Sequence, residues 1–252
     1  MIKKSYAKVN IFLKMAGKRD NYHELVSRFV RVKNLYDTVE FEKGKFDTFT
    51  LEGDFGCTLE QNTIFKAYRL LSKLFKDVET LFGNYRVLVK KTIPEFAGLG
   101  GGSSNCATFI IMVNEICNLG LSKDELSKIG EQIGADVPFF IYEYDSANVT
   151  GIGEIVEKFD EESLDIKVIT SGIKCDTGNI FREFRKNYYC EISKDEATVL
   201  MSMKSIDILN KLNTKEANDL YLPAIACEPK LETTKNNYYF SGSGSSFFCL
   251  KI

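Results

Sequence analysis

A glycine-rich segment between an expected strand and an expected helix constrains the fold of this chain more than any other feature. Residues 94–104 read PEFAGLGGGSS. The preceding residues, 85–93, alternate apolar and polar side chains as a half-buried strand does. The following residues, 107–113, form an apolar run that predicts a buried helix. Because glycine permits close backbone approach and a helix start presents unpaired N–H groups, the segment predicts a phosphate-binding loop.

This loop differs from the two commonest phosphate loops. A P-loop ends in Gly-Lys-Ser or Gly-Lys-Thr, and this segment has no such ending. A dinucleotide fingerprint counted from Gly98 would need a third glycine where Ser103 stands. Ser103 and Ser104 could instead cap the helix or donate hydrogen bonds to phosphate oxygens. A flexible linker is the alternative that composition alone would favour.

The length and charge of the chain set the broad class of protein. At 252 residues it suits one large domain or two modest ones. A net charge of −2 gives no global attraction to nucleic acid, so we expect no nucleic-acid partner. No apolar stretch approaches the roughly 20 residues of a membrane span, and residues 1–4 lead into a strand-like segment without a signal-peptide core. We therefore expect a cytoplasmic protein with no membrane partner.

The seven cysteines and the single histidine do not indicate a metal centre. The cysteines are scattered along the chain, and no pair has CxxC spacing. Most have apolar neighbours in sequence, so we interpret them as reduced core residues of a cytoplasmic protein. A zinc site is not expected, because zinc needs clustered cysteines or several histidines.

The order of predicted elements indicates two packed lobes without a polar linker. The first 50 residues predict strands at 7–15, 25–32 and 38–42, with a turn at 17–21. The middle of the chain predicts helices at 62–76, at 103–118 and from Ser122, where Glu125 completes a capping box. From Ile166 we expect a strand, helices near 178–188, 194–212 and 220–227, and a hairpin of 237–240 and 247–250. The boundary near residue 147 gives predicted domains 1–147 and 148–252.

Two charged residues are candidates for chemistry beside the loop. Asp136 precedes Val137 and Pro138, so its carboxylate could accept a proton from a hydroxyl nucleophile, or it could simply cap the next helix. Lys8 alternates with Asn10 on one face of the first strand. A lysine beside a carboxylate could lower the pKa of a hydroxyl and offset transition-state charge, whereas the alternative is an exposed strand lysine.

A histidine and a second Gly/Ser loop are further candidates. His23 is the only histidine, and a lone histidine is more often structural than functional. A Ser-His-Asp hydrolase would have to use it, but the Gly-x-Ser-x-Gly elbow is absent. Residues 241–246 read SGSGSS, which predicts either a hairpin turn or a backbone-donor loop that closes over phosphate.

These pieces together resemble the GHMP kinases. The matching segments are AKVNIFL at 7–13, NYHEL at 21–25, GLGGGSSN at 98–105, GADVP at 134–138, GIGE at 151–154, ANDL at 217–220 and SGSG at 241–244. They follow the order of the family over nearly the whole chain. The resemblance implies an α+β fold of two lobes, the first similar to ribosomal protein S5 domain 2 and the second ferredoxin-like.

The resemblance also implies a small-molecule kinase in non-mevalonate isoprenoid synthesis that uses ATP and Mg²⁺ on a cytidine-bearing acceptor. Asp136 would be the base and Lys8 its electrostatic partner, with Asn10 and Thr177 near the reacting groups. Tyr22 and Phe181 would enclose the cytosine, and His23 would bond its edge. The implied ATP-binding residues are Pro94, Gly98, Leu99, Gly100, Gly101, Gly102, Ser103 and Ser104.

Two alternative functions and one oligomeric state are further expectations. Another GHMP kinase would keep the loop and Asp136 but use a different acceptor pocket. A non-catalytic nucleotide-binding module would be favoured if Lys8 or Asp136 were missing, and the sequence has both. The expected assembly is a monomer or a weak homodimer.

Overall fold

The computed structural model describes residues 1–19, 22–231 and 238–251. The chain divides into two compact units, each built from separate stretches of sequence. Unit 1 consists of Met1–Ala7, Lys33–Ile93 and Gly101–Glu143. Unit 2 consists of Lys8–Val32, Pro94–Gly100 and Tyr144–Ile252. Each unit is described by itself below.

Two long strands run through both units. Strand β1 spans Ile2–Arg19 and strand β2 spans Tyr22–Lys43. The strands predicted at 25–32 and 38–42 are therefore one continuous strand, because the residues between them contain neither glycine nor proline to break it. The predicted turn at 17–21 is wrong for Gly17, Lys18 and Arg19, which continue β1. Its last two residues, 20 and 21, lie outside the described part of the chain.

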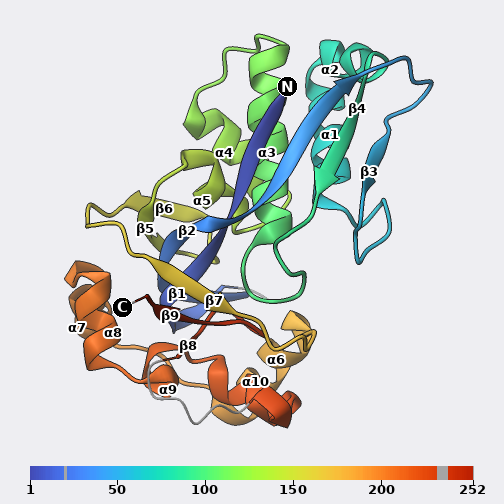
Figure 1. The fold of residues 1–252 in the computed structure, drawn as a ribbon. Coiled ribbons are helices and arrows are strands. Elements are labelled where there is room, and N and C mark those ends of the chain that lie inside the picture. Colours follow the sequence, from blue (N-terminus) through green and yellow to red (C-terminus); the bar gives the residue numbers. More distant parts are fainter. Residues whose placement is uncertain (20–21, 232–237, 252) are drawn as a thin grey trace. The chain divides into compact units, whose positions relative to one another are not determined.

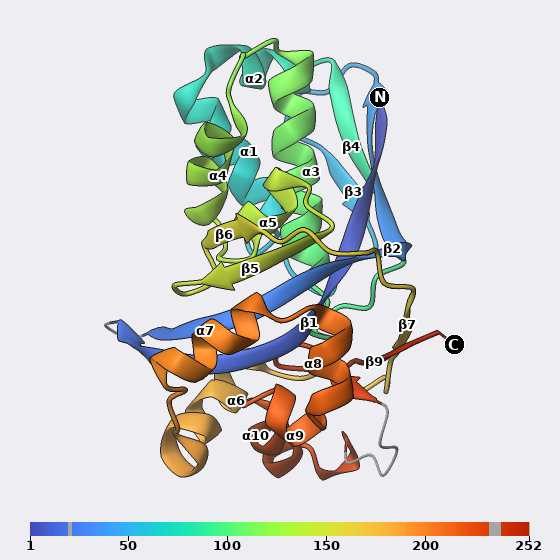
Figure 2. The same cartoon turned by 90° about the vertical axis from the view of Figure 1, so that its left-hand side faces the viewer.

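Unit 1 places helices on one face of its strands, as Figures 1 and 2 show. Strand β4 pairs with β2 in antiparallel register from Thr38↔Lys90 to Lys43↔Tyr85, and β3 pairs with β4 in parallel. The further elements of this unit are β3 (Leu51–Gly53), α1 (Thr63–Leu74), α2 (Lys76–Phe82), β4 (Tyr85–Lys90), α3 (Gly101–Ile116), α4 (Lys123–Glu131) and α5 (Val137–Tyr142). The helices predicted at 62–76 and from Ser122 are confirmed, and the Ser122–Glu125 capping box is present.

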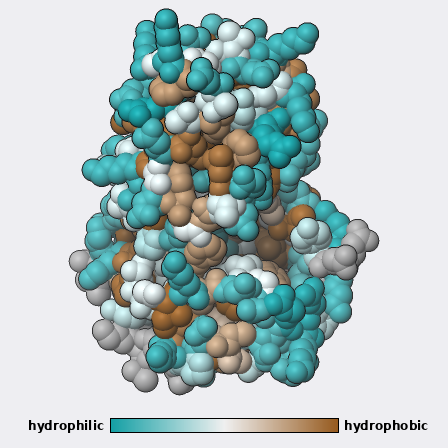
Figure 3. Space-filling model, turned by 90° about the vertical axis from the view of Figure 1, so that its right-hand side faces the viewer, coloured by the Kyte–Doolittle hydropathy of each residue, from teal (hydrophilic) through white to brown (hydrophobic). Residues whose placement is uncertain are grey.

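The core of unit 1 is aromatic and surrounds α3. The rings of Phe41, Phe82 and Phe109 contact one another with centroids 5.2–5.6 Å apart. Helix α3 is buried over most of its length because its sequence is apolar on nearly every side. This burial fixes the position of the helix start at Gly101 within unit 1. Figure 3 shows apolar side chains gathered on one side of the upper part of the molecule. A shallow hollow of this unit is lined by Ile2, Thr38, Glu40, Glu52, Gly53, Leu88, Val89 and Lys90.

Unit 2 contains a hairpin, a small antiparallel sheet and a group of short helices. Strands β5 (Ser146–Thr150) and β6 (Ile155–Lys158) pair with each other, and β5 also pairs with β2. The small sheet has the order β7-β9-β8. Its strands are β7 (Ile166–Ile169), β8 (Tyr239–Phe240) and β9 (Phe247–Leu250). The predicted terminal hairpin is thereby confirmed for its described residues, with Phe240 opposite Phe247; Asn237 lies outside them.

The helices of unit 2 gather beneath β1 and β2 in Figure 2. They are α6 (Thr177–Glu183), a π-helical turn (Phe184–Tyr188), α7 (Lys194–Ser202), α8 (Ser205–Lys211), α9 (Thr214–Ala217), α10 (Tyr221–Cys227) and a 3₁₀ turn (Pro229–Leu231). The helix predicted at 194–212 is two helices, because Met203 adopts an extended backbone with φ −73° and ψ 147°.

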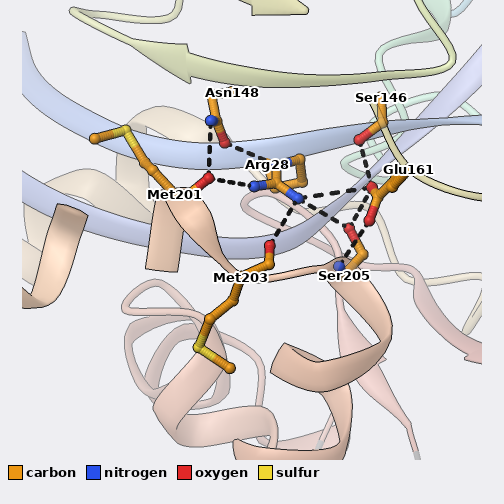
Figure 4. A network of polar contacts seen from close by, with 7 residues as sticks. All are labelled: Arg28, Ser146, Asn148, Glu161, Met201, Met203 and Ser205. Carbon is orange, nitrogen blue, oxygen red and sulfur yellow. Dashed lines mark hydrogen bonds and ion pairs between the residues drawn. The ribbon is translucent and has the colours of Figure 1, made fainter. Parts of the chain in front are cut away.

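A buried arginine holds the junction between α7 and α8 against β2, as Figure 4 shows. The side chain of Arg28 is fully buried. Its guanidinium donates to Asn148 Oδ1 at 2.7 Å, to the Met201 carbonyl at 2.8 Å and to the Met203 carbonyl at 3.3 Å. The last two groups lie at the C-terminal end of α7, where carbonyls lack partners within the helix. Arg28 therefore supplies the cap of this helix from a strand.

Glu161 completes the same network (Figure 4). Its carboxylate lies 3.6 Å from the Arg28 guanidinium and accepts from the backbone N–H of Ser205 at 2.7 Å, at the start of α8. It also accepts from the hydroxyls of Ser205 and Ser146 at 2.6 Å each. Burial lowers the pKa of Arg28 to about 10, and Glu161 opposes part of that shift. The arginine is thus charged at neutral pH and paired inside unit 2.

The expectation that the cysteines are core residues is wrong for most of them. Cys106 and Cys175 are buried, but Cys190 and Cys227 are exposed and the remaining three are intermediate. Apolar neighbours in sequence do not imply burial at the ends of short helices, where Cys227 lies. All seven are free thiols. In the described residues no helix is long and apolar enough to cross a membrane.

Candidate functional site

Lys8 is a buried lysine on β1 and belongs to unit 2. Only 3% of its surface is exposed, so the alternative of a solvent-exposed strand lysine is wrong. Its ammonium donates to Asn10 Oδ1 at 2.7 Å and to the Gly98 carbonyl at 3.2 Å. It also lies 4.4 Å from the centroid of the Phe29 ring. A buried charge is costly, and such groups occur mostly where function requires them.

The Gly98 carbonyl joins the glycine loop to the second Gly/Ser loop within unit 2. It accepts from both Lys8 Nζ and the hydroxyl of Ser241, the latter at 2.9 Å. Gly98 has φ +72°, and a Cβ at this position would lie 2.0 Å from the Ser241 carbonyl oxygen. Only glycine satisfies both the backbone conformation and this close approach. Residues 241–246 thus connect β8 to β9 as a hairpin turn that also packs on the glycine loop.

Asn218 and Thr177 contact this second loop from the helical side of unit 2. Asn218 is 2% exposed, and its amide donates to the Phe240 and Gly242 carbonyls at 3.0 and 2.9 Å. Thr177, the first residue of α6, shares a hydrogen bond of 2.7 Å with the Ser243 hydroxyl. The structure therefore brings Thr177 to the tip of the loop. Its place near the reacting groups stays a prediction.

His23 lies in an aromatic cluster of unit 2 and has two unsatisfied ring nitrogens. It is 7% exposed, and neither Nδ1 nor Nε2 has a hydrogen-bond partner in the described part of the chain. The Phe181 ring stacks over it at 5.8 Å, and the Phe184 ring meets it edge-on at 5.4 Å. Burial lowers the pKa of His23, and Arg185 lowers it further, so the imidazole is neutral at pH 7. A neutral imidazole offers one donor and one acceptor.

Tyr22 precedes His23 and is 64% exposed. Successive residues of a strand point to opposite faces, which separates the exposed Tyr22 ring from the buried His23 ring. The contact between His23 and Phe181 is therefore present, whereas the enclosure of a ligand between Tyr22 and Phe181 stays a prediction.

In unit 1, helix α3 begins at Gly101, two residues earlier than predicted. Ser103 and Ser104 thus lie inside the first turn, and the alternative in which they cap the helix is wrong. Ser104 is 2% exposed, and its Oγ accepts from the Ser5 hydroxyl at 2.8 Å. Gly102 is exposed, and its carbonyl accepts from the Thr63 hydroxyl at 2.8 Å. The N–H groups of this first turn have no intrahelical acceptors and form the positive end of the helix dipole.

Sequence reasoning missed a lysine beside this helix start. Lys91 Nζ lies 3.5 Å from the position that a Cβ on Gly101 would occupy. It is held by Asp37 and by Asn105 Oδ1, at 2.5 and 2.9 Å. Asp37 is fully buried and also accepts from the backbone N–H groups of Thr92 and Ile93. The signal in the sequence was a lysine directly after the strand that precedes a phosphate loop, where a cation complements an anionic ligand.

Asp136 stands in the turn before α5 in unit 1. It is half-buried, occupies the N-cap position with φ −81° and ψ −11°, and makes no side-chain capping bond. The interpretation as a conventional N-cap is therefore wrong for its carboxylate. A Cβ on Gly134 would lie 3.8 Å from the Ser103 hydroxyl, so the turn that carries Asp136 adjoins the start of α3.

The predicted residues fall into two groups, one in each unit. Unit 2 brings Lys8 and Asn10 together with Gly98 and the second loop, and holds His23 against Phe181. Unit 1 brings the start of α3 together with Lys91 and the Asp136 turn. Pro94, Leu99 and Gly100 lead into the helix, and the backbone N–H of Lys8 donates to the Leu99 carbonyl at 3.0 Å. Lys8 and Asp136 belong to different units, so their pairing stays a prediction.

Comparison with known proteins identifies the family of this chain. Residues 62–144 match the GHMP kinases N terminal domain. A relative from Sulfurimonas denitrificans, named 4-diphosphocytidyl-2-C-methyl-D-erythritol kinase, is 52% identical over 98% of this chain and 96% of its own length. The chain belongs to this kinase family. A Sulfurovum relative of the same name is 45% identical over 98% of each chain.

Solved structures of GHMP kinases share the fold of this family member. A crystal structure of 4-(cytidine 5'-diphospho)-2C-methyl-D-erythritol kinase has a TM-score of 0.75 and 27% identity, and it covers 99% of this chain and 90% of the solved one. The expected GHMP kinase fold with mixed helices and strands is thereby confirmed. The residue roles within that fold are not tested by these similarities and are argued below.

Proposed function

We propose that this chain transfers the γ-phosphoryl group of ATP to the 2-hydroxyl of 4-diphosphocytidyl-2-C-methyl-D-erythritol, in the non-mevalonate isoprenoid pathway. Relatives up to 52% identical over nearly the full chain carry the name of this kinase. The observation that carries the proposal on this chain is the buried Lys8 ammonium, which faces Asn10 and the glycine loop. A buried cation at a phosphate loop is suited to offset charge that develops during phosphoryl transfer.

In the proposed reaction the acceptor oxygen attacks the γ-phosphorus as the bond to the β–γ bridging oxygen breaks and ADP leaves. Asp136 accepts the proton of the acceptor hydroxyl, because a carboxylate in a turn beside the loop is the base available in unit 1. Lys8 offsets negative charge on the reacting oxygens. The first-turn N–H groups of α3 and the ammonium of Lys91 bind the ATP phosphates. Positioning and charge stabilisation account for most catalysis of this kind.

Mg²⁺ would enter this site with ATP. The described residues contain no group of three or more His, Cys, Asp or Glu side chains that could hold a metal ion. Mg²⁺ commonly keeps several waters and binds through substrate phosphates and one or two protein oxygens, so the small donor set fits it. The Ser103 hydroxyl and the Asp136 carboxylate are the oxygens of unit 1 beside the helix start that would contribute. When bound, the ion would neutralise charge on the phosphate oxygens.

The acceptor pocket is proposed around His23. Cytosine presents an amino donor beside a ring-nitrogen acceptor, and a neutral imidazole presents the complementary acceptor and donor. Because the two ring nitrogens of an imidazole point in diverging directions, one unsatisfied nitrogen of His23 can pair with this edge, either as a donor to the ring nitrogen or as an acceptor from the amino group. Phe181 supplies an aromatic face from α6, and the exposed Tyr22 supplies the second face when a base is bound.

The first prediction from this pocket concerns acceptor choice. The protein is expected to phosphorylate the cytidine-bearing acceptor and to ignore mevalonate, homoserine and galactose, because those molecules leave the polar groups of His23 unpaired. A steady-state assay over the four acceptors measures this. Comparable kcat/KM for homoserine or mevalonate would leave only the broader GHMP kinase function.

In Tyr22→Ala the KM of the acceptor should rise about tenfold, the effect of losing one stacked ring, with the KM of ATP unchanged.

A second prediction concerns the phosphate loop. Gly102→Ala should weaken ATP binding about tenfold, because the added methyl blocks close backbone approach to phosphate. The structure itself tolerates the methyl, since a Cβ there meets only the Thr63 hydroxyl at 3.7 Å. Gly101 is a poorer choice, because a Cβ there would meet Ile93 at 3.0 Å.

Calorimetric titration with ATP and a thermal melt separate binding from folding for Gly102→Ala. The matched control is Gly83→Ala, in the same unit at the end of α2, where the backbone is helical with φ −72°. The control should bind ATP like the wild type. Unchanged ATP affinity in a folded Gly102→Ala protein would remove the start of α3 from the phosphate site.

Finer features of the protein are proposed on the same basis. The proposed family domains are 1–147, similar to ribosomal protein S5 domain 2, and 148–252, ferredoxin-like, and they differ from the two compact units, which interleave along the chain. Short helices beside the antiparallel β7-β9-β8 sheet support the second. Use of ATP supports a cytoplasmic location. A small-molecule acceptor and a net charge of −2 give no reason for a nucleic-acid or membrane partner, and the protein acts as a monomer or weak homodimer.

A further inference from the structure

Ser27 lies at the end of a buried chain of hydrogen bonds that begins at Lys8. Ser27 is fully buried on β2, and Asn10 beside it on β1 is 1% exposed. Lys8 Nζ donates to Asn10 Oδ1 at 2.7 Å, and Asn10 Nδ2 donates to Ser27 Oγ at 3.0 Å. The Ser27 hydroxyl in turn donates to the Phe12 carbonyl at 2.5 Å. All these groups belong to unit 2.

The donor-to-acceptor direction of this series of hydrogen bonds is fixed at the Phe12 end. A backbone carbonyl can only accept a hydrogen bond, so the single proton of the Ser27 hydroxyl is committed to Phe12. Toward Asn10, the Ser27 oxygen then acts only as an acceptor. The Asn10 amide must therefore direct its NH₂ group to Ser27 and its carbonyl oxygen to Lys8. Without Ser27, the two orientations of the amide would be distinguished by Lys8 alone.

The orientation of this amide matters because an ammonium has only donors. If the Asn10 amide turned over, its NH₂ group would face the Lys8 ammonium and the two groups would repel. The ammonium would then keep the Gly98 carbonyl but lose its shorter hydrogen bond. We infer that Ser27 is a positioning residue, which fixes the Asn10 amide and through it the Lys8 ammonium. The inference rests on the proposed function, in which Lys8 acts on the reacting phosphoryl group.

Arg28, the next residue, lies on the opposite face of β2 and has a different structural role. Arg28 binds the end of α7, whereas Ser27 faces Asn10. Because side chains alternate along a strand, the two networks are separate. Ser146 belongs to the Arg28 network, is also a buried strand serine and donates to Glu161. It serves as the matched control for loss of a buried hydroxyl.

The first test compares Ser27→Ala, Ser27→Thr and Ser146→Ala in the steady-state kinase assay. Ser27→Ala should lower kcat about tenfold, the usual scale for losing one hydrogen bond that orients a catalytic group, with both KM values unchanged. Ser27→Thr keeps the hydroxyl and should retain the wild-type kcat. Ser146→Ala should lower the melting temperature without changing kcat. A wild-type kcat in folded Ser27→Ala would overturn the inference.

A double-mutant cycle tests whether Ser27 acts through Asn10. In an Asn10→Ala background there is no amide to orient, so adding Ser27→Ala should cause no further loss of kcat. Equal losses in both backgrounds would show an independent structural effect and would overturn the positioning role. If Ser27→Ala does not fold, Ser27→Cys replaces it, and its weaker acceptor should give an intermediate kcat; a kcat equal to that of the wild type would contradict the inference.

A measurement without substrate keeps the inference separate from the proposed function. The side-chain amide of Asn10, assigned by NMR in the full chain, should be protected from hydrogen exchange in the wild type and in Ser27→Thr. In Ser27→Ala the protection should be lost, while the backbone amides of β1 keep theirs. Retained protection in Ser27→Ala would overturn the positioning role. If protection is lost as expected but the protein phosphorylates no acceptor, the proposed function fails and the hydrogen-bond chain stands.

Discussion

Asp136→Asn is expected to abolish turnover while ATP continues to bind. Asparagine has the shape of aspartate but cannot accept the proton of the acceptor hydroxyl, and loss of a general base typically lowers the rate by about 10²–10⁴. The Asp136 side chain makes no capping hydrogen bond to α5, so the start of that helix does not depend on its charge. The measurement is kcat with the cytidine-bearing acceptor, beside ATP affinity by titration and a thermal melt.

The matched control for this base is Asp124→Asn in the same unit. Asp124 lies in the first turn of α4 and accepts a hydrogen bond of 2.9 Å from the Tyr142 hydroxyl, on an exposed surface. Its replacement should leave kcat unchanged. A kcat near the wild-type value in Asp136→Asn would refute the assignment of Asp136 as the base, whereas loss of ATP affinity together with kcat would assign it to nucleotide binding.

The largest expected effect on stability comes from Arg28→Met. Methionine fills similar space but removes the charge, which leaves the buried Glu161 carboxylate without its cation and the Met201 and Met203 carbonyls without their donor. Breaking one partner of a buried ion pair costs about 3–5 kcal/mol of unfolding free energy. Equilibrium unfolding in urea measures it.

Arg19→Met in the same unit is the control for this effect. Arg19 also pairs with two carboxylates, Glu24 and Glu154, but 45% of its side chain is exposed. Exposed ion pairs contribute little to stability, so the control should lose much less stability than Arg28→Met. If both variants lost the same small amount, the Arg28 network would not hold the α7–α8 junction. If Arg28→Met lost stability but gained it back with Glu161→Leu, the unpaired carboxylate would be identified as the cause.

The glycine loop and its flanking elements were predictable because their signals are local. The strand, loop and helix order at 85–116 follows from alternation, glycine content and an apolar run. The structure confirms this order, but the strand ends at Lys90 rather than Ile93 and α3 starts two residues early. The face shared by Lys8 and Asn10 was predictable for the same reason, since strand period alone places both on one side. Membership of the GHMP kinases followed from motifs that are short and ordered.

Residues that act through distant partners could not be predicted in this way. From sequence alone, Arg28 would be predicted to be a surface charge on a strand. Its partners Met201 and Met203 lie more than 170 positions away in sequence. The role of Asp37 on β2 likewise follows only from its contact with Lys91, which lies 54 positions away in sequence. Exposure of Cys190 and Cys227 depends on how short helices pack, which apolar neighbours in sequence do not determine. Each of these features is set by tertiary contacts.

The passage of β1 and β2 through both units has a consequence for engineering this enzyme. The chain changes unit at 7/8, 32/33, 93/94, 100/101 and 143/144, so neither unit is encoded by one uninterrupted stretch of the gene. A chimera made by joining the first half of this kinase to the second half of a relative would mix parental sequences inside unit 2. Parental surfaces that meet within one core must match in volume to pack well. We therefore expect stable chimeras of two relatives to need paired crossovers, so that side chains that pack together in one core come from the same parent. Chimeras with a single crossover should be the least stable.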